Sequence, residues 1–448
     1  MIAKNVDAAA PTAGSRRGAA LLRHLNPLNV FDKLSDSYGY LRLLIKGTRR
    51  RQGWFLENLT FRKAVNMAVS GAQFALKSER MHTLPVAVKI DISPMCNLSC
   101  TVCVHADPND NPALEKQDFD PKQRMTVDQF RRIIDQVKGR SAAVSLYYVG
   151  DPLVHPDLDE MCGIARDAGL NVHISTNYSF ALTDARIRRI VRSGLTHLTV
   201  CVDGLSQEKY QLTRVGGRID RVLSNLKRTC EARRELGQVY PKVEVQFIKF
   251  QHNVDELEAA RHKVLSYGVD QFTDFWGSLT NYTDNDPDVF EVQGPHKNER
   301  LPQCFWPHSS IVIKYNGDVI PCCSFRIGMQ YASEDDPRII GNIFRTSIQE
   351  VWNNKKYQQA RQLVSNPEAV HADPSLKDHF CYSCPVLFHT TDELHWRNAS
   401  SHKYEDIYTV GSDGRPKKRS AAETGLPDRA NGRTVSTIGL PGGHVAQV

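Results

Sequence analysis

The chain has 448 residues, of which 41% are hydrophobic and 24% charged, as in an ordinary soluble globular protein. Its longest apolar runs fall far short of the roughly 20 residues that cross a bilayer, and residues 1–18 have no apolar signal-peptide core. Eleven cysteines without an export signal favour metal ligation in a reducing compartment over disulfides. We therefore expect a cytoplasmic protein with no transmembrane segment.

Positive charge is concentrated at the N-terminal end. Residues 1–90 hold 15 Lys or Arg against 5 Asp or Glu, a net charge of +10, so the remainder carries −3 of the chain's +7. This basic excess predicts contact with an anionic partner, which could be a membrane surface, a phosphorylated substrate or nucleic acid. A solvated helical face is the simpler interpretation.

The two ends of the chain differ in composition from its centre. Residues 1–20 are small, polar and alanine-rich, which predicts disorder. Residues 21–83 have helical spacing and predict a basic arm of short amphipathic helices, packed on the fold or lying on a membrane surface. We favour packing on the fold. Residues 400–448 are polar and predict a disordered tail.

Strand-like and helix-like runs alternate from residue 84 to residue 278. Apolar and polar residues alternate in the first run, as in a strand. Thr126 and Gln129 fit a capping box at the start of the first helix. Such alternation implies a parallel sheet with right-handed crossovers. We expect strands at residues 86–92, 143–149, 171–175, 196–202, 243–250 and 271–276, and helices at residues 126–137, 158–168, 184–192, 219–234 and 254–267.

Three closely spaced cysteines follow the first strand. Cys96, Cys100 and Cys103 form a C-x3-C-x2-C loop. Thiolates are the usual ligands of iron–sulfur clusters. Three of them leave one iron of a cubane without a protein ligand, and that iron can bind a substrate or cofactor. A zinc loop is the alternative, with His105 as a possible fourth ligand.

In these residues the chain resembles the radical S-adenosylmethionine (SAM) superfamily, over about residues 84–395. The C-x3-C-x2-C loop after the first barrel strand is the signature of that family, although Val102 stands where an aromatic residue is usual. The resemblance implies an α/β fold with a partial, open (β/α)6 TIM-like barrel. It also implies a [4Fe–4S] cluster on the three cysteines, with SAM bound at the open iron. Ligand sites of such barrels gather at the C-terminal ends of the strands.

Polar residues stand at the ends of the expected strands. Residues 150–152 resemble the family's G-E-P loop, with Asp151 in place of Glu, and imply contact with the amino group of SAM. The stretch before Gly204 resembles the family's S-x-D-G motif, with Cys201 in place of Ser. Taken singly, each is also an ordinary turn or strand end. The cofactor-binding residues implied are Gly150, Asp151, Pro152, Thr176, Asn177, Asp203 and Arg214.

A second cysteine set follows a polar stretch, residues 279–303, which we expect to be a linker or lid. Cys304 and Cys322 flank an Asn-Gly turn between short apolar runs, a strong hairpin signal. Thr346, Gln349, Val351 and Trp352 predict the start of a capped helix. Cys381 and Cys384 form a C-x2-C pair. Cys323 competes with Cys322 as a ligand, and a four-cysteine zinc site remains the alternative.

The pattern C-x12-G-x4-C, then Gly341-Asn342, then C-x2-C resembles the SPASM/twitch extension of radical SAM enzymes, here residues 304–395. This small domain would contain a β-hairpin and a helix. The full SPASM pattern has seven cysteines and two auxiliary clusters. The smaller number here implies one auxiliary [4Fe–4S] cluster, on Cys304, Cys322, Cys381 and Cys384, suited to electron transfer.

The resemblance implies a radical SAM oxidoreductase. A 5′-deoxyadenosyl radical would abstract hydrogen from an unactivated C–H bond, and the auxiliary cluster would accept a second electron supplied by the substrate. We expect a small or carrier-linked sugar, cyclitol or alcohol as substrate, and a one-electron donor such as flavodoxin or ferredoxin. One alternative is a maturase that cross-links or epimerises a ribosomally made peptide. Another is a non-enzymatic, zinc-stabilised basic binding protein. The general base and the oligomeric state stay open.

Overall fold

The structure is a computed structural model that describes residues 57–276 and 302–381, except residues 102, 107–118, 251, 303, 323–338 and 380. It also describes four short strands between residues 408 and 447. The described residues belong to one compact unit, residues 55–448. The predictions for residues 1–56 and for the polar stretch 279–301 lie outside the described residues.

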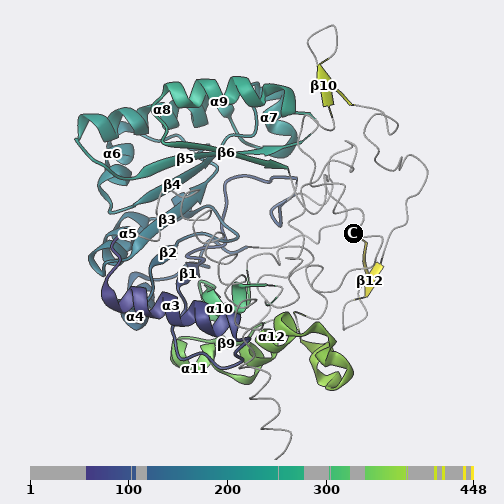
Figure 1. The fold of residues 1–448 in the computed structure, drawn as a ribbon. Coiled ribbons are helices and arrows are strands. Elements are labelled where there is room, and N and C mark those ends of the chain that lie inside the picture. The colour runs from purple at the N-terminus through teal and green to yellow at the C-terminus, as the bar shows by residue number, and fades with distance from the viewer. Residues whose placement is uncertain are drawn as a thin grey trace, which may run out of the picture. The chain divides into compact units, whose positions relative to one another are not determined.

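Six parallel strands form the centre of the fold, and each pairs with the next one along the chain. This confirms the predicted α/β fold and its parallel sheet (Figure 1). The second strand ends at Ser145, four residues earlier than expected. The strands are β1 (Ala87–Ile90), β2 (Ala143–Ser145), β3 (Asn171–Thr176), β4 (His197–Cys201), β5 (Lys242–Lys249) and β6 (Gln271–Trp276).

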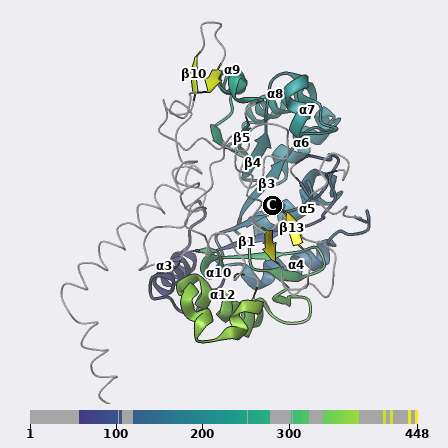
Figure 2. The same ribbon diagram turned by 90° about the vertical axis from the view of Figure 1, so that its right-hand side faces the viewer.

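Helices between successive strands cover one face of this sheet (Figures 1 and 2). The predicted capping box is confirmed, because Thr126 Oγ1 accepts from the backbone N–H of Gln129 at 3.2 Å. One short helix after β4 was not predicted. The helices are α4 (Val127–Val137), α5 (Leu158–Asp167), α6 (Asp184–Arg192), the unpredicted α7 (Gln207–Thr213), α8 (Ile219–Glu235) and α9 (Leu257–Ser266), the last preceded by the 3-10 turn η2 (Val254–Glu256).

The predicted hairpin joins the barrel sheet. β7 (Ser310–Ile313) and β8 (Asp318–Ile320) pair antiparallel around the Asn-Gly turn, as predicted. β7 also pairs in parallel with β1, on the edge of β1 that faces away from β2. β9 (Gly341–Asn342) then pairs with β8. The sheet described therefore has nine strands, and the second cysteine region continues it.

Short helices follow β9. The N-cap of α11 (Ile348–Trp352) is Ser347, which forms a capping box with Glu350. The predicted capped helix is thus confirmed, and its N-cap lies one residue after Thr346. α10 (Trp306–Ser309) precedes β7. The other elements of this region are α12 (Lys355–Ser365) and the 3-10 turns η3 (Pro367–His371) and η4 (Pro374–Asp378).

The core lies between the sheet and its helices. Alternate strand residues such as Val88, Val144 and Val172 are fully buried in this core. α4 contributes Phe130 and Ile133 to the same cluster. Burial of this apolar surface is the main force that holds helices to the sheet.

Elements at the two ends complete the description. α3 (Phe61–Ala75), capped by Thr60, confirms a helix within the predicted arm. In the predicted tail the described residues form two antiparallel pairs, β10 (Tyr408–Val410) with β11 (Pro416–Lys418) and β12 (Thr437–Gly439) with β13 (Val445–Gln447). None of the helices in the described residues has the length and apolar character needed to cross a membrane.

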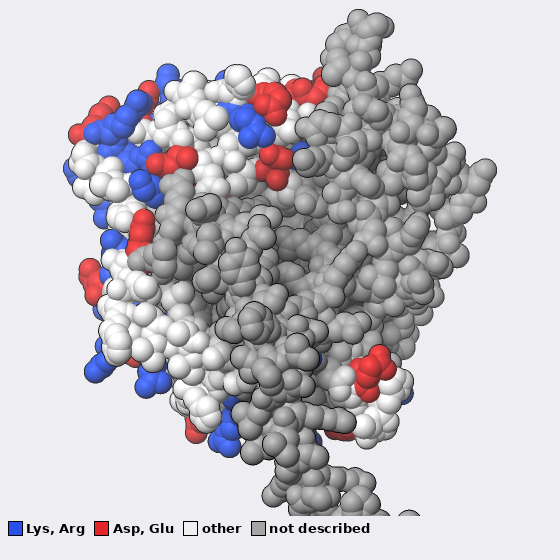
Figure 3. Space-filling view, viewed as in Figure 1, with Lys and Arg blue, Asp and Glu red and all other residues white. Residues whose placement is uncertain are grey.

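Charged side chains on α6 pair with neighbouring acidic residues. Arg186 and Arg189 lie beside Asp159, and Arg188 pairs with Glu235. Figure 3 shows basic and acidic side chains intermixed in the upper left, where Figure 1 places α6. Arg188 and Arg189 are thus solvated, whereas the Arg186 side chain is mostly buried.

Candidate cluster and cofactor site

The three-cysteine loop begins six residues after the end of β1, at the C-terminal edge of the sheet. Cys100 is buried, and Cys96 and Cys103 are partly exposed. Burial, the Asp151 carboxylate and the two neighbouring thiols raise the pKa of Cys96. Burial also raises the pKa of Cys100 to about 11, against the lowering effect of the Arg214 guanidinium. The three thiols are thus close enough for a charge on one to affect the others.

Hydrogen bonds hold this loop against the segments that follow other strands. The backbone N–H groups of Ser99 and Thr101 donate to the carbonyls of Val215 and Thr213 at 3.1 and 3.2 Å. Asn97 Nδ2 donates to the carbonyl of Ser179 at 3.0 Å. The positions of the thiols are therefore fixed by segments after β3 and β4.

Gly150 packs closely against the backbone of the residues that lead into the cysteine loop. A Cβ atom at Gly150 would lie 2.3 Å from the carbonyl oxygen of Ser93 and 2.4 Å from that of Met95. Any side chain there would collide with backbone, so only glycine fits. The next residue, Asp151, donates its N–H to the Met95 carbonyl at 2.8 Å. The predicted Gly-Asp-Pro loop thus packs directly on the residues that lead to Cys96.

The structure brings Asp151, Thr176 and Asn177 together. Both carboxylate oxygens of Asp151 accept from Thr176 Oγ1, at 2.9 and 2.8 Å, and one accepts from the Asn177 N–H at 2.8 Å. The Leu153 N–H at 3.0 Å makes Asp151 the cap of the 3-10 turn η1 (Pro152–Val154). Burial raises the pKa of Asp151 to about 6. Asn177 Nδ2 reaches Cys96 Sγ at 3.8 Å, so this group adjoins the cysteine loop.

Asp203 and Arg214 form a second polar pair beside the loop. Arg214 Nε and Nη2 both lie 2.6 Å from one oxygen of Asp203, and the other oxygen accepts from the Ile248 N–H at 2.8 Å. Arg214 Nη1 lies 4.0 Å from Cys100 Sγ. A guanidinium here offsets negative charge on the thiolates. Asp203 acts on the site through Arg214.

The inner face of the sheet carries polar side chains that sequence reasoning missed. His173 Nε2 lies 2.9 Å from Thr199 Oγ1, and Glu244 accepts from Thr199 at 3.4 Å and from Thr273 at 2.6 Å. Ser145 Oγ lies 3.5 Å from His173 Nδ1. These residues alternate with the apolar ones that face the helices, and this alternation was the available signal. Closed parallel barrels usually fill this face with Val, Ile and Leu.

The second cysteine set is partly described. Cys304 precedes α10, Cys322 follows β8, and Cys381 lies beyond η4. Burial raises the pKa of Tyr357, and Cys322 and Cys381 raise it further, so both thiols lie near this hydroxyl. Cys384 and Cys323 lie outside the described residues, so the choice between Cys322 and Cys323 stays open.

An apolar cluster links the two cysteine regions. It comprises Val104, Tyr148, Val149, Val312 and Ile320, and both Cys103 and Trp306 pack against it. Cys103 belongs to the first set, whereas Trp306 and Ile320 each lie two residues from a cysteine of the second set. Residues of both cysteine regions therefore pack against the same apolar cluster.

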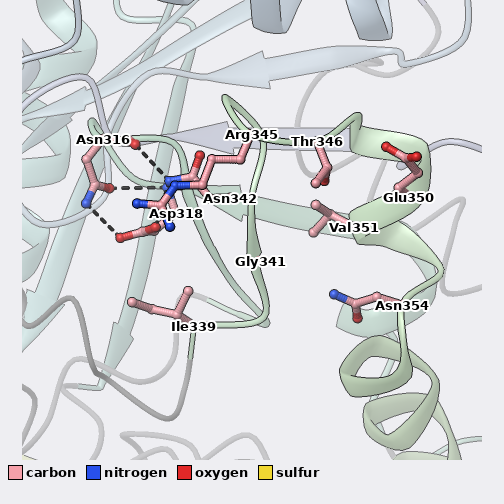
Figure 4. Close-up of a pocket in the computed structure, with 10 residues that line it drawn as sticks. All are labelled: Asn316, Asp318, Ile339, Gly341, Asn342, Arg345, Thr346, Glu350, Val351 and Asn354. Atoms are coloured by element: carbon pink, nitrogen blue, oxygen red, sulfur yellow. Dashed lines mark hydrogen bonds between the residues drawn. The ribbon is translucent and has the colours of Figure 1, made fainter.

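A pocket of about 650 Å³ lies among the hairpin, β9 and α11 (Figure 4). Asn342 Nδ2 donates to the Asn316 carbonyl at 3.1 Å and to Asp318 at 2.8 Å, which fixes the turn. None of the predicted site residues lines this pocket. Among the residues described, no three Cys, His, Asp or Glu side chains converge as ligands of a single metal ion would.

Comparison with known families agrees with this arrangement. The radical SAM superfamily matches residues 90–241, and the SPASM iron–sulfur cluster-binding domain matches residues 304–385. The chain therefore carries a radical SAM domain followed by a SPASM domain, as predicted. These two domains imply a [4Fe–4S] cluster, SAM and auxiliary iron–sulfur clusters, in agreement with the predicted cofactors. The individual site residues and the domain boundaries stay predictions.

Curated relatives match a limited part of the chain. This chain is 28% identical over 147 residues to the AdoMet-dependent heme synthase of Methanosarcina barkeri. The match covers 33% of this chain and 39% of the relative. It is 28% identical over 130 residues to a 7,8-dihydro-6-hydroxymethylpterin dimethyltransferase of Methanocaldococcus jannaschii, covering 29% and 24%. The chain therefore spans less than two fifths of the length of these relatives.

Two solved radical SAM structures are also similar. SuiB of Streptococcus suis bound to S-adenosylmethionine is 16% identical, with 73% of this chain and 79% of that chain covered and a TM-score of 0.49. BtrN in complex with AdoMet and 2-DOIA is 17% identical, with 64% and 89% covered and a TM-score of 0.38.

The residues of the first site fit a cluster with bound SAM. The three thiols stand on one short loop, near enough for a charge on one to affect the others, and thiolates are the usual ligands of iron–sulfur clusters. Arg214 supplies a compensating positive charge beside Cys100. Thr176, Asn177 and Asp151 gather at the strand ends next to Cys96, where polar groups of a cofactor could bind.

Proposed function

We propose that the chain is a radical SAM oxidoreductase that removes two electrons from a small or carrier-linked sugar, cyclitol or alcohol. The observation that supports this proposal is the polar inner face of the sheet. A sheet face that carries hydroxyl, imidazole and carboxylate groups suits a hydroxylated substrate better than an apolar one, because buried polar groups need hydrogen-bond partners.

When bound, the cluster with SAM supplies hydrogen-atom abstraction, and the auxiliary cluster accepts the second electron. Cys96, Cys100 and Cys103 hold the first group, and Arg214 offsets its charge. Oxidation of a carbinol to a carbonyl removes one hydrogen atom from carbon, one proton from oxygen and one electron. The protein must therefore provide a proton acceptor near the hydroxyl.

His173 is the acceptor that we propose. Its ring contacts Thr199, which in turn donates to Glu244, so a proton taken up by the imidazole meets a nearby carboxylate. Thr273 donates to the other oxygen of Glu244 and orients it. Histidine suits this role because its ordinary pKa lies near neutrality.

The test begins with anaerobic protein reconstituted with iron and sulfide. We expect about eight iron atoms per chain, from two cubane clusters, together with 5′-deoxyadenosine formation from SAM. A panel of cyclitols, amino sugars and alcohols deuterated at the carbinol carbon should transfer deuterium into 5′-deoxyadenosine. Colourless, zinc-loaded protein without SAM cleavage would overturn the proposal in favour of the binding protein.

A variant pair tests His173. We expect His173→Gln to retain iron and SAM cleavage while substrate oxidation falls by about 100-fold or more, the usual contribution of a general base. His262→Gln is the matched control, because His262 is exposed on α9, and it should behave as the wild type. Equal oxidation by both variants would remove His173 from the mechanism.

The peptide-maturase alternative enters the same assay. The pairs β10–β11 and β12–β13 form two small sheets separate from the sheet of the barrel and hairpin. A strand-containing element is what a maturase would use to hold a peptide. Short peptides encoded beside the gene should therefore be incubated with the protein, and a mass change in one of them would replace the small-molecule proposal.

A further inference from the structure

Helix α3 packs against the fold through its polar side. Lys63, Asn66, Ser70 and Gln73 are all buried. These residues recur at three- and four-residue spacing and therefore lie on one face of the helix. In an ordinary surface helix that face would be apolar and the opposite face polar. Apart from Phe74, which is also buried, the arrangement in α3 is inverted.

Hydrogen bonds hold α3 in this orientation. Lys63 Nζ donates to the carbonyl of Gly169, and Asn66 pairs with both the N–H and the carbonyl of Leu84, at 3.0 and 2.9 Å. Ser70 Oγ donates to the carbonyl of His308 at 2.8 Å. Rotation of α3 to bury its apolar side would break these bonds. The backbone groups of Gly169, Leu84 and His308 would then lack their partners.

The outward side of α3 is apolar. Phe61 is 83% exposed and Leu76 is 70% exposed, and Val65 and Val69 are exposed between them. Five of the nine large hydrophobic residues that are exposed in the described part of the chain fall within residues 59–76. The other four are scattered over different elements, as is normal for a surface. The stripe on α3 therefore marks an interaction surface.

Charge identifies the partner. The 56 residues that precede the described part hold 10 Lys or Arg and 3 Asp or Glu, a net charge of +7, and Arg62 is exposed beside Phe61. Apolar side chains flanked by excess positive charge suit the surface of an anionic bilayer. A second copy of the chain would carry the same net charge of +7, and repulsion between like charges opposes that pairing.

We propose that α3 lies on an anionic lipid membrane, with Phe61, Val65, Val69 and Leu76 inserted among the acyl chains. The helix remains attached to the barrel by its polar side and therefore docks as a preformed surface. Arg62, exposed beside Phe61, contributes attraction to lipid phosphates. This proposal does not rest on the proposed oxidoreductase function.

The test is cosedimentation of the full chain with vesicles. The wild type should bind vesicles of phosphatidylcholine with phosphatidylglycerol and bind phosphatidylcholine alone more weakly. The triple variant Phe61→Ser, Val65→Ser, Val69→Ser should lower partitioning into the mixed vesicles by about tenfold or more, because three apolar side chains no longer insert. The matched control replaces Val239 and Leu265, exposed on other elements, with serine and should bind as the wild type.

Three outcomes would overturn the proposal. These are failure of the wild type to bind either vesicle, equal binding by wild type and triple variant, and a lipid-free dimer that the triple variant converts to a monomer. The last would assign the stripe to a second copy. If the triple variant misfolds, Phe61→Trp replaces it. Its added fluorescence should be quenched by brominated lipid in mixed vesicles, and absence of quenching would likewise reject insertion.

Discussion

The two cysteine sites of this protein are assembled in different ways. The first takes all three thiols from one short loop, held by hydrogen bonds to the segments after β3 and β4. The second draws Cys304, Cys322 and Cys381 from three separate elements that contact one another through α12. A local site depends on loop geometry, whereas a dispersed site depends on packing between distant segments. The two should therefore fail under different substitutions.

Removing one thiol from each site gives the largest contrast. Cys100→Ala should lose about four irons and all SAM cleavage, because no cluster with an open iron remains. Cys381→Ala should also lose iron but retain SAM cleavage, since the first loop is intact. Iron analysis and 5′-deoxyadenosine release on anaerobic protein measure both effects. Equal loss of cleavage in the two variants would mean that the sites fold as one unit.

Arg361 should be the most sensitive residue of the dispersed site outside its cysteines. It is fully buried and donates to the carbonyls of Pro307, Glu79 and Trp352, at 2.8, 2.8 and 2.6 Å. Its guanidinium also stacks on Trp352, 4.5 Å from the ring centroid. Arg361→Met should therefore lower the free energy of unfolding by about 3–5 kcal/mol, because three carbonyls lose their donors.

The readout for Arg361 is urea denaturation of the apo-protein together with iron content after reconstitution. We expect loss of auxiliary iron with SAM cleavage retained. Arg188→Met on α6 is the control, since Arg188 is exposed and pairs with Glu235 at the surface. That change should stay within about 0.5 kcal/mol. A comparable loss in both variants would contradict a special role for Arg361.

The local site should show its own pH dependence through Asp151. Burial raises the pKa of this carboxyl from 3.8 to about 6. Between these values the folded state binds more protons at Asp151 than the unfolded state does. The contribution of Asp151 to stability is therefore fully present below about pH 4 and is lost as pH rises through 6. The loss should amount to at most about 3 kcal/mol. Urea denaturation of apo-protein across this range, with Asp151→Asn as comparison, measures it, and parallel curves would refute it.

Short-range signals predicted local structure well. The capping box at Thr126, the Asn-Gly hairpin and the three-cysteine loop each depend on a few neighbouring residues. The pairing of β7 with β1 joins residues more than 200 positions apart and has no local signal. Similarly, the sequence alone would predict that Arg361, an arginine on an amphipathic helix, is solvated. Its burial follows from segments that meet only in the folded chain.

The inner face of the sheet and α3 mark a different limit. Polar residues alternate along the predicted strands, as His173 does between Val172 and Ile174, so the polar face could have been identified from sequence. For α3 the amphipathic pattern is visible, but which side packs inward is decided by carbonyls of distant loops such as Gly169 and His308. Periodicity defines the faces of a helix and leaves their environment open.

Tyr357 gives the smallest and most specific test of the dispersed site. Its buried hydroxyl finds no hydrogen-bond partner within the described part of the chain, and it lies near Cys322 and Cys381. In the apo-protein Tyr357→Phe should raise stability by about 1 kcal/mol, because a buried polar group without a partner is removed. In the loaded protein the hydroxyl would donate to a ligand sulfur, and such hydrogen bonds stabilise the reduced state. The variant should therefore shift the midpoint potential of the auxiliary cluster to a more negative value.

The potential of the first cluster is the internal control, because Tyr357 adjoins the other cysteine set. Redox titration followed by electron paramagnetic resonance resolves the two clusters in one sample. A selective negative shift supports a hydrogen bond from Tyr357 to the auxiliary ligands. An unchanged auxiliary potential together with higher apo-protein stability would mean that the hydroxyl stays without a partner in the loaded state. The auxiliary ligands would then receive no hydrogen bond from Tyr357, whereas Arg214 Nη1 lies 4.0 Å from Cys100 Sγ in the first site.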